Sequence, residues 1–271
     1  MDVSFIILTW NSSSYIENCL KSYIHLLEEN NTTAEFLIVD NGSIDNTPDI
    51  IMNEIVPRLS TDHTINVIRL DKNYGTTISR NIALKRSTGK YIIICDSDTQ
   101  YYKGSLKAAF DFIETRNDVG LIAPLLLWPD GEPQSTIRKF PTLYSKGFRF
   151  INIFLKLPIK YSDIYEGFPW SEKKPVEVAA SACWLLKREI LDIVGYFDER
   201  IFYSPEDVDY CMRINRKGLK VIYYPDILIY HHCQRITHKN PLSRHSLSHM
   251  LGLLYYFMKY KYLFNPTKSL K

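Results

Sequence analysis

The stretch Lys90-Tyr-Ile-Ile-Ile-Cys-Asp-Ser-Asp-Thr-Gln100 joins an apolar run to a pair of acids. Residues 92–94 are three isoleucines, too few for a helix, and they predict a strand that is buried on both faces. The run ends in Asp96-Ser97-Asp98. Two carboxylates this close repel each other, so a cation between them would stabilise the pair, and a divalent metal prefers such oxygen ligands. The alternative interpretation is a solvated turn in which Asp98 or Thr99 caps the next helix.

Three strand-and-helix units precede this stretch. Phe5–Thr9, Phe36–Asp40 and Val67–Leu70 are short apolar runs, each followed by a polar loop and a segment that favours a helix. Ser14 and Glu17 have the spacing of a capping box at the start of the first helix. The alternation predicts an α/β fold: a Rossmann-like, mostly parallel open sheet with helices on both faces.

The four predicted strands all end in small polar residues. In open α/β sheets, ligands bind beyond the carboxyl ends of the strands, so we expect the four loops to converge on one ligand crevice. The strand ends are Thr9-Trp10-Asn11, Asp40-Asn41-Gly42, Asp71-Lys72-Asn73 and Asp96-Ser97-Asp98.

Two residues in these loops, and one in the helix predicted after the third loop, suit a nucleotide. Asp40 can accept hydrogen bonds from a base or ribose, Gly42 lets the backbone approach a ligand, and Arg80 is placed to meet a diphosphate. The first strand is not followed by G-x-G-x-x-G, and the chain has no G-x-x-x-x-G-K-[ST]. Dinucleotide-binding sites of that type and P-loops are therefore disfavoured.

The second half of the chain adds two further groups of polar residues. After a predicted strand at residues 121–124 and an irregular region to about Val176, residues 179–186 favour another strand. Glu206 and Asp207 lie on the first turn of a predicted helix that ends at Gly218, where the helix dipole alone would favour acids. Predicted strands at residues 221–224 and 228–230 lead to His231-His232.

Taken together, these motifs resemble the inverting family 2 glycosyltransferases with the GT-A fold, and within them the rhamnosyltransferase-like subgroup that builds surface polysaccharides. The resemblance covers Val3 to His232. The motifs that carry it are Ile7-Leu8-Thr9-Trp10-Asn11, Val39-Asp40-Asn41-Gly42-Ser43-x-Asp45-x-Thr47, Asn73-x-Gly75, Asp96-Ser97-Asp98 and Glu206-Asp207-x-Asp209-x-x-x-Arg213.

The resemblance implies roles for these residues. Asp96 and Asp98 would bind Mg²⁺ or Mn²⁺, with His231 as a further metal or diphosphate contact and His232 as its alternative. Arg235 is a second alternative for the diphosphate, because Cys233–Thr237 replaces the G-x-S that the family often has there. The nucleotide-sugar donor would be bound by Thr9, Asn11, Asp40, Gly42, Asn73, Gly75, Arg80, Asp96, Ser97 and Asp98.

Inversion at the anomeric carbon is a single displacement, so one base must take the proton of the acceptor hydroxyl. The resemblance makes Asp207 that base, with Glu206 as the fallback and with Asp209 and Arg213 positioning it or pairing with it.

The resemblance thus implies a metal-dependent transferase that moves a hexosyl or deoxyhexosyl group from a UDP-, dTDP- or GDP-linked sugar to a glycan acceptor, for which a lipid-linked glycan is one candidate. One alternative is a sugar-1-phosphate nucleotidyltransferase, which should carry a G-x-G-x-R-[LM] loop where this chain has Thr9–Ser12. Another is a non-catalytic partner with the GT-A fold, against which the intact acids argue.

Charge and composition suggest where the protein works. The net charge is +3, but residues 133–162 and 227–271 contain thirteen bases and no acid, which leaves 20 bases against 30 acids elsewhere. The bases lie among aromatic and aliphatic residues, so we expect amphipathic helices on an anionic membrane surface; the alternative is that these helices pack on the domain. Nucleic acid is disfavoured because the body is acidic.

The expected organisation is one catalytic domain over residues 1–232 with a C-terminal amphipathic basic extension over residues 233–271. The nucleotide-binding half would span about 1–124 and the acceptor-binding half about 125–232. The five cysteines lack C-x-x-C spacing and no signal peptide or membrane span is predicted, so we expect reduced thiols and a cytoplasmic location on the inner face of the membrane.

Overall fold

Four parallel strands form one half of a nine-stranded sheet in the computed structural model, which describes residues 2–58, 63–146, 163–233 and 244–266. These strands are β1 (Val3–Thr9), β2 (Ala34–Asp40), β3 (Thr64–Arg69) and β4 (Tyr91–Asp96), in the spatial order β3-β2-β1-β4. Thr9 is in register with Asp40, and Leu8 with Asp96. The carboxyl ends therefore lie at one edge, as the sequence predicted.

The other half of the sheet is mixed. Its path continues from β4 as β10-β6-β11-β5, with β8 also paired to β11. β10 is antiparallel to both β4 and β6, whereas β6 and β11 are parallel. The strands are β5 (Thr99–Lys103), β6 (Val119–Leu127), β8 (Lys174–Val176), β10 (Cys183–Lys187) and β11 (Lys220–His231); a separate pair is β7 (Ile137–Arg138) with β9 (Val178–Ala179).

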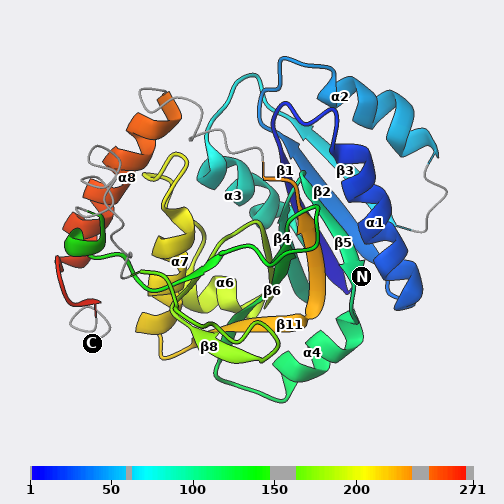
Figure 1. The fold of residues 1–271 in the computed structure, drawn as a ribbon. Coiled ribbons are helices and arrows are strands. Elements are labelled where there is room, and N and C mark those ends of the chain that lie inside the picture. The colour runs from blue at the N-terminus through cyan, green and yellow to red at the C-terminus, as the bar shows by residue number, and fades with distance from the viewer. Residues whose placement is uncertain (1, 59–62, 147–162, 234–243, 267–271) are drawn as a thin grey trace.

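Helices cover both faces of the sheet (Figure 1). Successive side chains of a strand point to opposite faces, and Ile92 and Ile94 accordingly lie in one apolar core while Ile93 lies in the other. The core of Ile93 contains α1 (Ile16–Glu29) and α4 (Leu106–Glu114). The opposite core contains α3 (Thr76–Arg86), α6 (Glu189–Val194), α7 (Glu206–Arg216) and α8 (Arg244–Tyr260). A short helical run begins with α2 (Thr47–Asp49) and continues through η1 (Ile50–Ile55) and η2 (Val56–Arg58).

Several local predictions were wrong. The Ser14–Glu17 capping box is absent, because α1 begins at Ile16 without a side-chain cap and the Ser12 carbonyl accepts the Tyr15 and Ile16 N–H groups. Residues 221–224 and 228–230 belong to the single strand β11, which carries a register shift between Tyr224 and Leu228. The alternative interpretation, in which Asp98 or Thr99 caps a helix, is also excluded, because the chain enters the strand β5 at Thr99 and Ser105 caps α4.

The C-terminal helix α8 packs beside α7 (Figure 1). Its residues Tyr256, Phe257 and Tyr260 are buried in the same core as α7. Within the described ranges, no helix is long and apolar enough to cross a bilayer. The other segment expected to be amphipathic lies largely in residues 147–162, outside the described residues. The division of the chain into a catalytic domain and an extension stays a prediction.

Candidate active site

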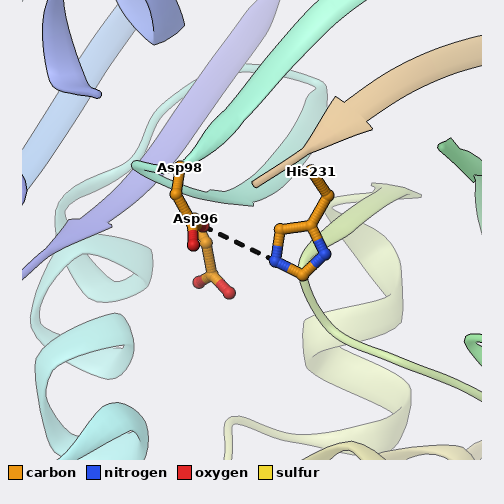
Figure 2. Close-up of side chains that lie close together, drawn as sticks. All are labelled: Asp96, Asp98 and His231. Carbon is orange, nitrogen blue, oxygen red and sulfur yellow. Dashed lines mark ion pairs between the residues drawn. The ribbon is translucent and has the colours of Figure 1, made fainter. Parts of the chain in front are cut away.

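Asp96, Asp98 and His231 meet where β4, β5 and β11 end or begin (Figure 2). Antiparallel pairing of β5 with β11 sets His231 opposite Thr99, and the His232 N–H donates to the Asp98 carbonyl at 3.0 Å. His231 Nε2 thereby lies 3.6 Å from Asp98 Oδ1. One ligand atom from each of the three side chains lies within 4.8 Å of the others. Two carboxylates and an imidazole nitrogen at this spacing can hold a divalent cation.

Between the two histidines, the geometry favours His231. The ring of His232 packs on Tyr15, with ring centroids 5.2 Å apart, and only its backbone reaches Asp98. Arg235, the other alternative for the diphosphate, lies outside the described residues.

Arg80 is buried beneath the two acidic motifs. Its side chain is 1% exposed, and its guanidinium donates to Asp96 at 2.6 Å and to Glu206 at 3.4 Å. It also donates to the hydroxyl and carbonyl oxygens of Ser181, at 2.8 and 3.2 Å. The same guanidinium thus ties the end of β4 to the start of α7. Contact between Arg80 and a diphosphate stays a prediction.

Ser181 is a residue that sequence reasoning missed. The predicted strand over residues 179–186 is in fact two strands, β9 and β10, and Ser181 lies in the break between them. Its hydroxyl donates to Glu206 Oε1 at 2.9 Å. A break of regular pairing inside the Ala179-Ala180-Ser181-Ala182 run carries no sequence signal that distinguishes it from a continuous strand.

Glu206 and Asp207 begin α7, as predicted, but their surroundings differ. Glu206 is 7% exposed, and burial together with the neighbouring Asp207 carboxylate raises its pKa to about 8, against the opposing effect of Arg80. Asp207 is half-buried, and burial raises its pKa although the Val208 N–H donates to its Oδ1 at 2.8 Å. Asp207 is therefore the more accessible of the two carboxylates.

Asp209 and Arg213 do not pair with Asp207. Arg213 Nε donates to Asp209 Oδ2 at 3.0 Å, and its Nη1 donates to the Val194 carbonyl. The other oxygen of Asp209 accepts from Lys259 and Tyr260 of α8. Among the described residues the expected pairing with Asp207 is therefore absent, because helical periodicity points Asp209 away from residue 207 and toward α8. A positioning role for Asp209 and Arg213 stays a prediction.

At the ends of β1 and β2, two buried oxygens have no hydrogen-bond partner within the described residues. These are Thr9 Oγ1 and Asp40 Oδ2, on residues that are 1% and 0% exposed and in register with each other. Asp40 Oδ1 accepts from the Ser43 hydroxyl, and burial raises the pKa of Asp40. Unpaired buried polar atoms are costly, so a ligand that donates to them here would be favoured.

The loop after β1 is held by the loop after β2. The Asn11 N–H donates to Ser43 Oγ at 2.9 Å, and Asn11 Oδ1 accepts from the Ile44 N–H at 2.9 Å. Ser97 of the acidic motif donates to the Ser12 hydroxyl at 2.8 Å. Three of the polar loops are thus joined by direct hydrogen bonds.

The loop after β3 connects the loops of β1–β4 with the segment that precedes α7. Asn73 Oδ1 accepts from the Gly75 N–H at 2.9 Å, and the Thr76 N–H donates to the Phe202 carbonyl at 2.7 Å. Gly75 has φ +86°, and a Cβ there would collide with Phe202. Gly42 has φ +70°, and a Cβ there would collide with the backbone of Lys72 and Asn73. Both glycines therefore serve the packing of the loops, and their contacts with a donor stay predictions.

The Glycosyl transferase family 2 profile matches residues 4–195, well over half of the chain. The chain belongs to this family. The glycosyltransferase is 26% identical over 265 residues to the N-acetylglucosaminyl-diphospho-decaprenol L-rhamnosyltransferase of Mycobacterium tuberculosis, an alignment that covers 90% of this chain and 80% of that protein. The family expected from the motifs is confirmed.

Solved structures resemble the glycosyltransferase in fold. Staphylococcus aureus TarS (residues 1–349) in complex with UDP superposes with a TM-score of 0.56 and 23% identity, over 85% of this chain and 60% of that one. The mannosyltransferase PcManGT from Pyrobaculum calidifontis, in complex with GDP-Man and Mn²⁺, gives 0.59 and 18% identity, over 88% and 59%. These likenesses confirm the GT-A fold.

Proposed function

We propose that this glycosyltransferase moves one sugar from a nucleotide-sugar to an acceptor hydroxyl, with inversion and with the help of a divalent metal. One observation carries the proposal. The Asp96–Asp98–His231 cluster and the Glu206–Asp207 pair lie at one edge of the sheet, joined through Arg80. A cation site for a leaving diphosphate and a carboxylate that can act as base are the two parts that a single displacement needs.

Asp96, Asp98 and His231 would hold the metal, which supplies positive charge to the departing diphosphate. Thr9 and Asp40 would pair their free oxygens with donor groups of the nucleotide. Asp207 would take the proton of the acceptor hydroxyl as that oxygen attacks the anomeric carbon. Arg80 and Ser181 would hold Glu206 in place rather than contact the sugar.

The substrates follow from the relatives by analogy. The M. tuberculosis relative is named for a decaprenyl diphosphate-linked acceptor, and the solved structures of similar fold contain UDP in one case and GDP-Man with Mn²⁺ in the other. We infer a UDP-, dTDP- or GDP-linked hexose or deoxyhexose as donor, Mn²⁺ or Mg²⁺ as the metal, and a lipid-linked glycan of surface polysaccharide assembly as acceptor.

An acceptor of this kind would be held at a membrane, and α8 offers a surface for one. Its inner face is buried, while its outer face exposes five apolar side chains at helical spacing, each by more than half. They are Leu247, Met250, Leu251, Leu254 and Met258. We propose that this face, the α8 outer face, binds the cytoplasmic surface of the membrane peripherally, where free cysteines such as those of this chain stay reduced.

A thermal-shift screen of UDP-, dTDP- and GDP-sugars with Mn²⁺ or Mg²⁺ tests the donor and the metal. The donor should raise the melting temperature only with the metal, and released nucleoside diphosphate should then report turnover. Formation of nucleoside triphosphate and sugar 1-phosphate from the nucleotide-sugar, on addition of pyrophosphate, would instead indicate a nucleotidyltransferase.

Asp98→Ala is expected to abolish both turnover and metal-dependent nucleotide binding, because it removes a cluster ligand. Asp111→Ala is the control, since Asp111 is exposed on α4 and pairs only with Lys107 in the described structure. Tight, Mn²⁺-dependent nucleotide binding by Asp98→Ala would contradict the metal assignment.

A further inference from the structure

Gln134 lies between β6 and β7, is 3% exposed and has both ends of its carboxamide bonded. Its Nε2 donates to the carbonyl oxygens of Leu127 at 3.1 Å and His231 at 2.6 Å. Its Oε1 lies 2.9 Å from His231 Nδ1. The Gln134 N–H donates to the Leu126 carbonyl at 2.8 Å, so the backbone is also fixed. Sequence reasoning gave this residue no role.

The two carbonyl contacts determine which way the carboxamide faces. A backbone carbonyl oxygen only accepts hydrogen bonds, so the NH₂ group of Gln134 must face Leu127 and His231, and Oε1 must face the imidazole. Because Oε1 is itself an acceptor, Nδ1 of His231 must carry the proton. In neutral His231 the lone pair then lies on Nε2, the nitrogen that is 3.6 Å from Asp98.

Asp98 alone would favour the opposite tautomer. A carboxylate beside Nε2 attracts a proton to that nitrogen, and an Nε2–H group could not coordinate a metal. We propose that Gln134 is a positioning residue that holds His231 as the Nδ1–H tautomer and so keeps Nε2 open to the cation. The inference rests on the metal dependence proposed above and adds the group that prepares its nitrogen ligand.

Gln134→Met tests this role, because methionine has nearly the same length and offers neither the amide acceptor nor its donors. Long-range ¹H–¹⁵N NMR of the metal-free protein reads the tautomer directly. Wild type should show His231 as Nδ1–H, and Gln134→Met should shift it toward Nε2–H. The affinity for Mn²⁺ alone, measured by electron paramagnetic resonance, should fall about 10–100-fold.

Two matched variants complete the design. Gln134→Glu, as the neutral acid, keeps an oxygen acceptor for Nδ1–H and one donor for the His231 carbonyl, so it should retain the Nδ1–H tautomer, which separates hydrogen bonding from packing. Gln100→Met is the control for the chemical change, since Gln100 is half-buried on β5 opposite Tyr230; it should alter neither the tautomer nor the affinity. Thermal unfolding of each variant verifies that it is folded.

The outcomes separate this role from the proposed function. An Nε2–H tautomer in wild type, or an unchanged tautomer and Mn²⁺ affinity in Gln134→Met, would overturn the role of Gln134 and leave the metal site intact. Absence of Mn²⁺ binding by wild type would refute the proposed metal dependence, and the role of Gln134 with it.

Discussion

Arg80 is shared unequally by two acids. Its 2.6 Å contact with Asp96 is shorter than its 3.4 Å contact with Glu206, so the buried Glu206 receives the weaker compensation. Burial and the nearby Asp207 then raise the pKa of Glu206, so Glu206 holds a proton more readily than an ordinary glutamate. A protonated carboxyl cannot accept the proton of an acceptor hydroxyl. This favours Asp207 as the base.

Substitution of the two acids should therefore have different effects. Asp207→Asn should lower kcat by about 10²–10⁴-fold while donor affinity is retained, because a base acts only as the acceptor attacks. Glu206→Gln should keep most of the activity, since glutamine resembles the protonated acid. The measurements are steady-state kinetics and donor binding by calorimetry. An active Asp207→Asn together with an inactive Glu206→Gln would assign the base to Glu206.

The pH dependence follows from the direction of the Asp207 shift. Burial raises the pKa of Asp207 above its ordinary value of 3.8, and the base works only when ionised. As the pH falls, kcat/KM at saturating Mn²⁺ should therefore decline at a higher pH than an ordinary aspartate would give. The residual activity of Asp207→Asn should lack this decline. A wild-type profile that stays flat down to the ordinary value would contradict the assignment.

At the scale of elements, ion pairs and hydrogen bonds to buried aspartates hold α8 against α7. Lys259 Nζ donates to Asp209, whose side chain is 1% exposed. It also donates to Asp198, at 2.8 Å. Burial opposes ionisation of Asp198, but hydrogen bonds from Arg200, Lys259 and Tyr255 hold its pKa well below the usual value. Lys259, one of the bases expected to face an anionic membrane, therefore forms ion pairs within the protein instead.

Removal of this lysine should destabilise the fold. Lys259→Met leaves Asp209 with fewer donors in a buried site, and the free energy of unfolding should fall by about 1–3 kcal/mol. Urea denaturation measures the change, and Lys261→Met, at an exposed position three residues before Phe264, is the control. Equal stability of the two variants would mean that the Lys259 contacts are no stronger than exposed ion pairs.

At the scale of the whole molecule, the half of the sheet built from β1–β4 was predictable, and the packing around it was not. Apolar runs with polar ends identify β1–β4 and the edge where they converge. The partners of Arg80 could not be predicted in this way, because the two acids that it contacts lie 16 and 126 residues away in the chain. Tyr256 and Phe257 are buried against the domain. In sequence they look the same as aromatics that enter a membrane, and only the fold distinguishes the two.

Membrane binding should depend on the α8 outer face more than on charge. Among the bases counted in the two acid-free segments, Lys146 pairs with Asp163 and Lys259 with two aspartates, so both are neutralised within the protein. Each remaining base near an anionic surface contributes roughly 1 kcal/mol, screened by salt. The exposed leucines and methionines supply an apolar contribution that salt does not screen.

Vesicle co-sedimentation tests this with the double variant Leu254→Gln/Met258→Gln. Truncation before α8 would be a poor test, because it would also remove Tyr256, Tyr260 and Lys259 from the core and unfold part of the domain. The double variant should bind vesicles containing anionic lipid at least about tenfold more weakly, since each polar replacement forfeits apolar burial. Met52→Gln, which alters a half-exposed methionine on η1, far from α8, should bind like wild type.

Salt and lipid composition separate the two contributions to binding. Raising the salt concentration should weaken wild-type binding only in part, and purely neutral vesicles should retain a reduced share of the protein, because the apolar contribution remains. Full recovery of wild type in the supernatant with anionic vesicles at low salt would contradict membrane binding. Equal binding of wild type and the double variant would place the contact elsewhere on the molecule.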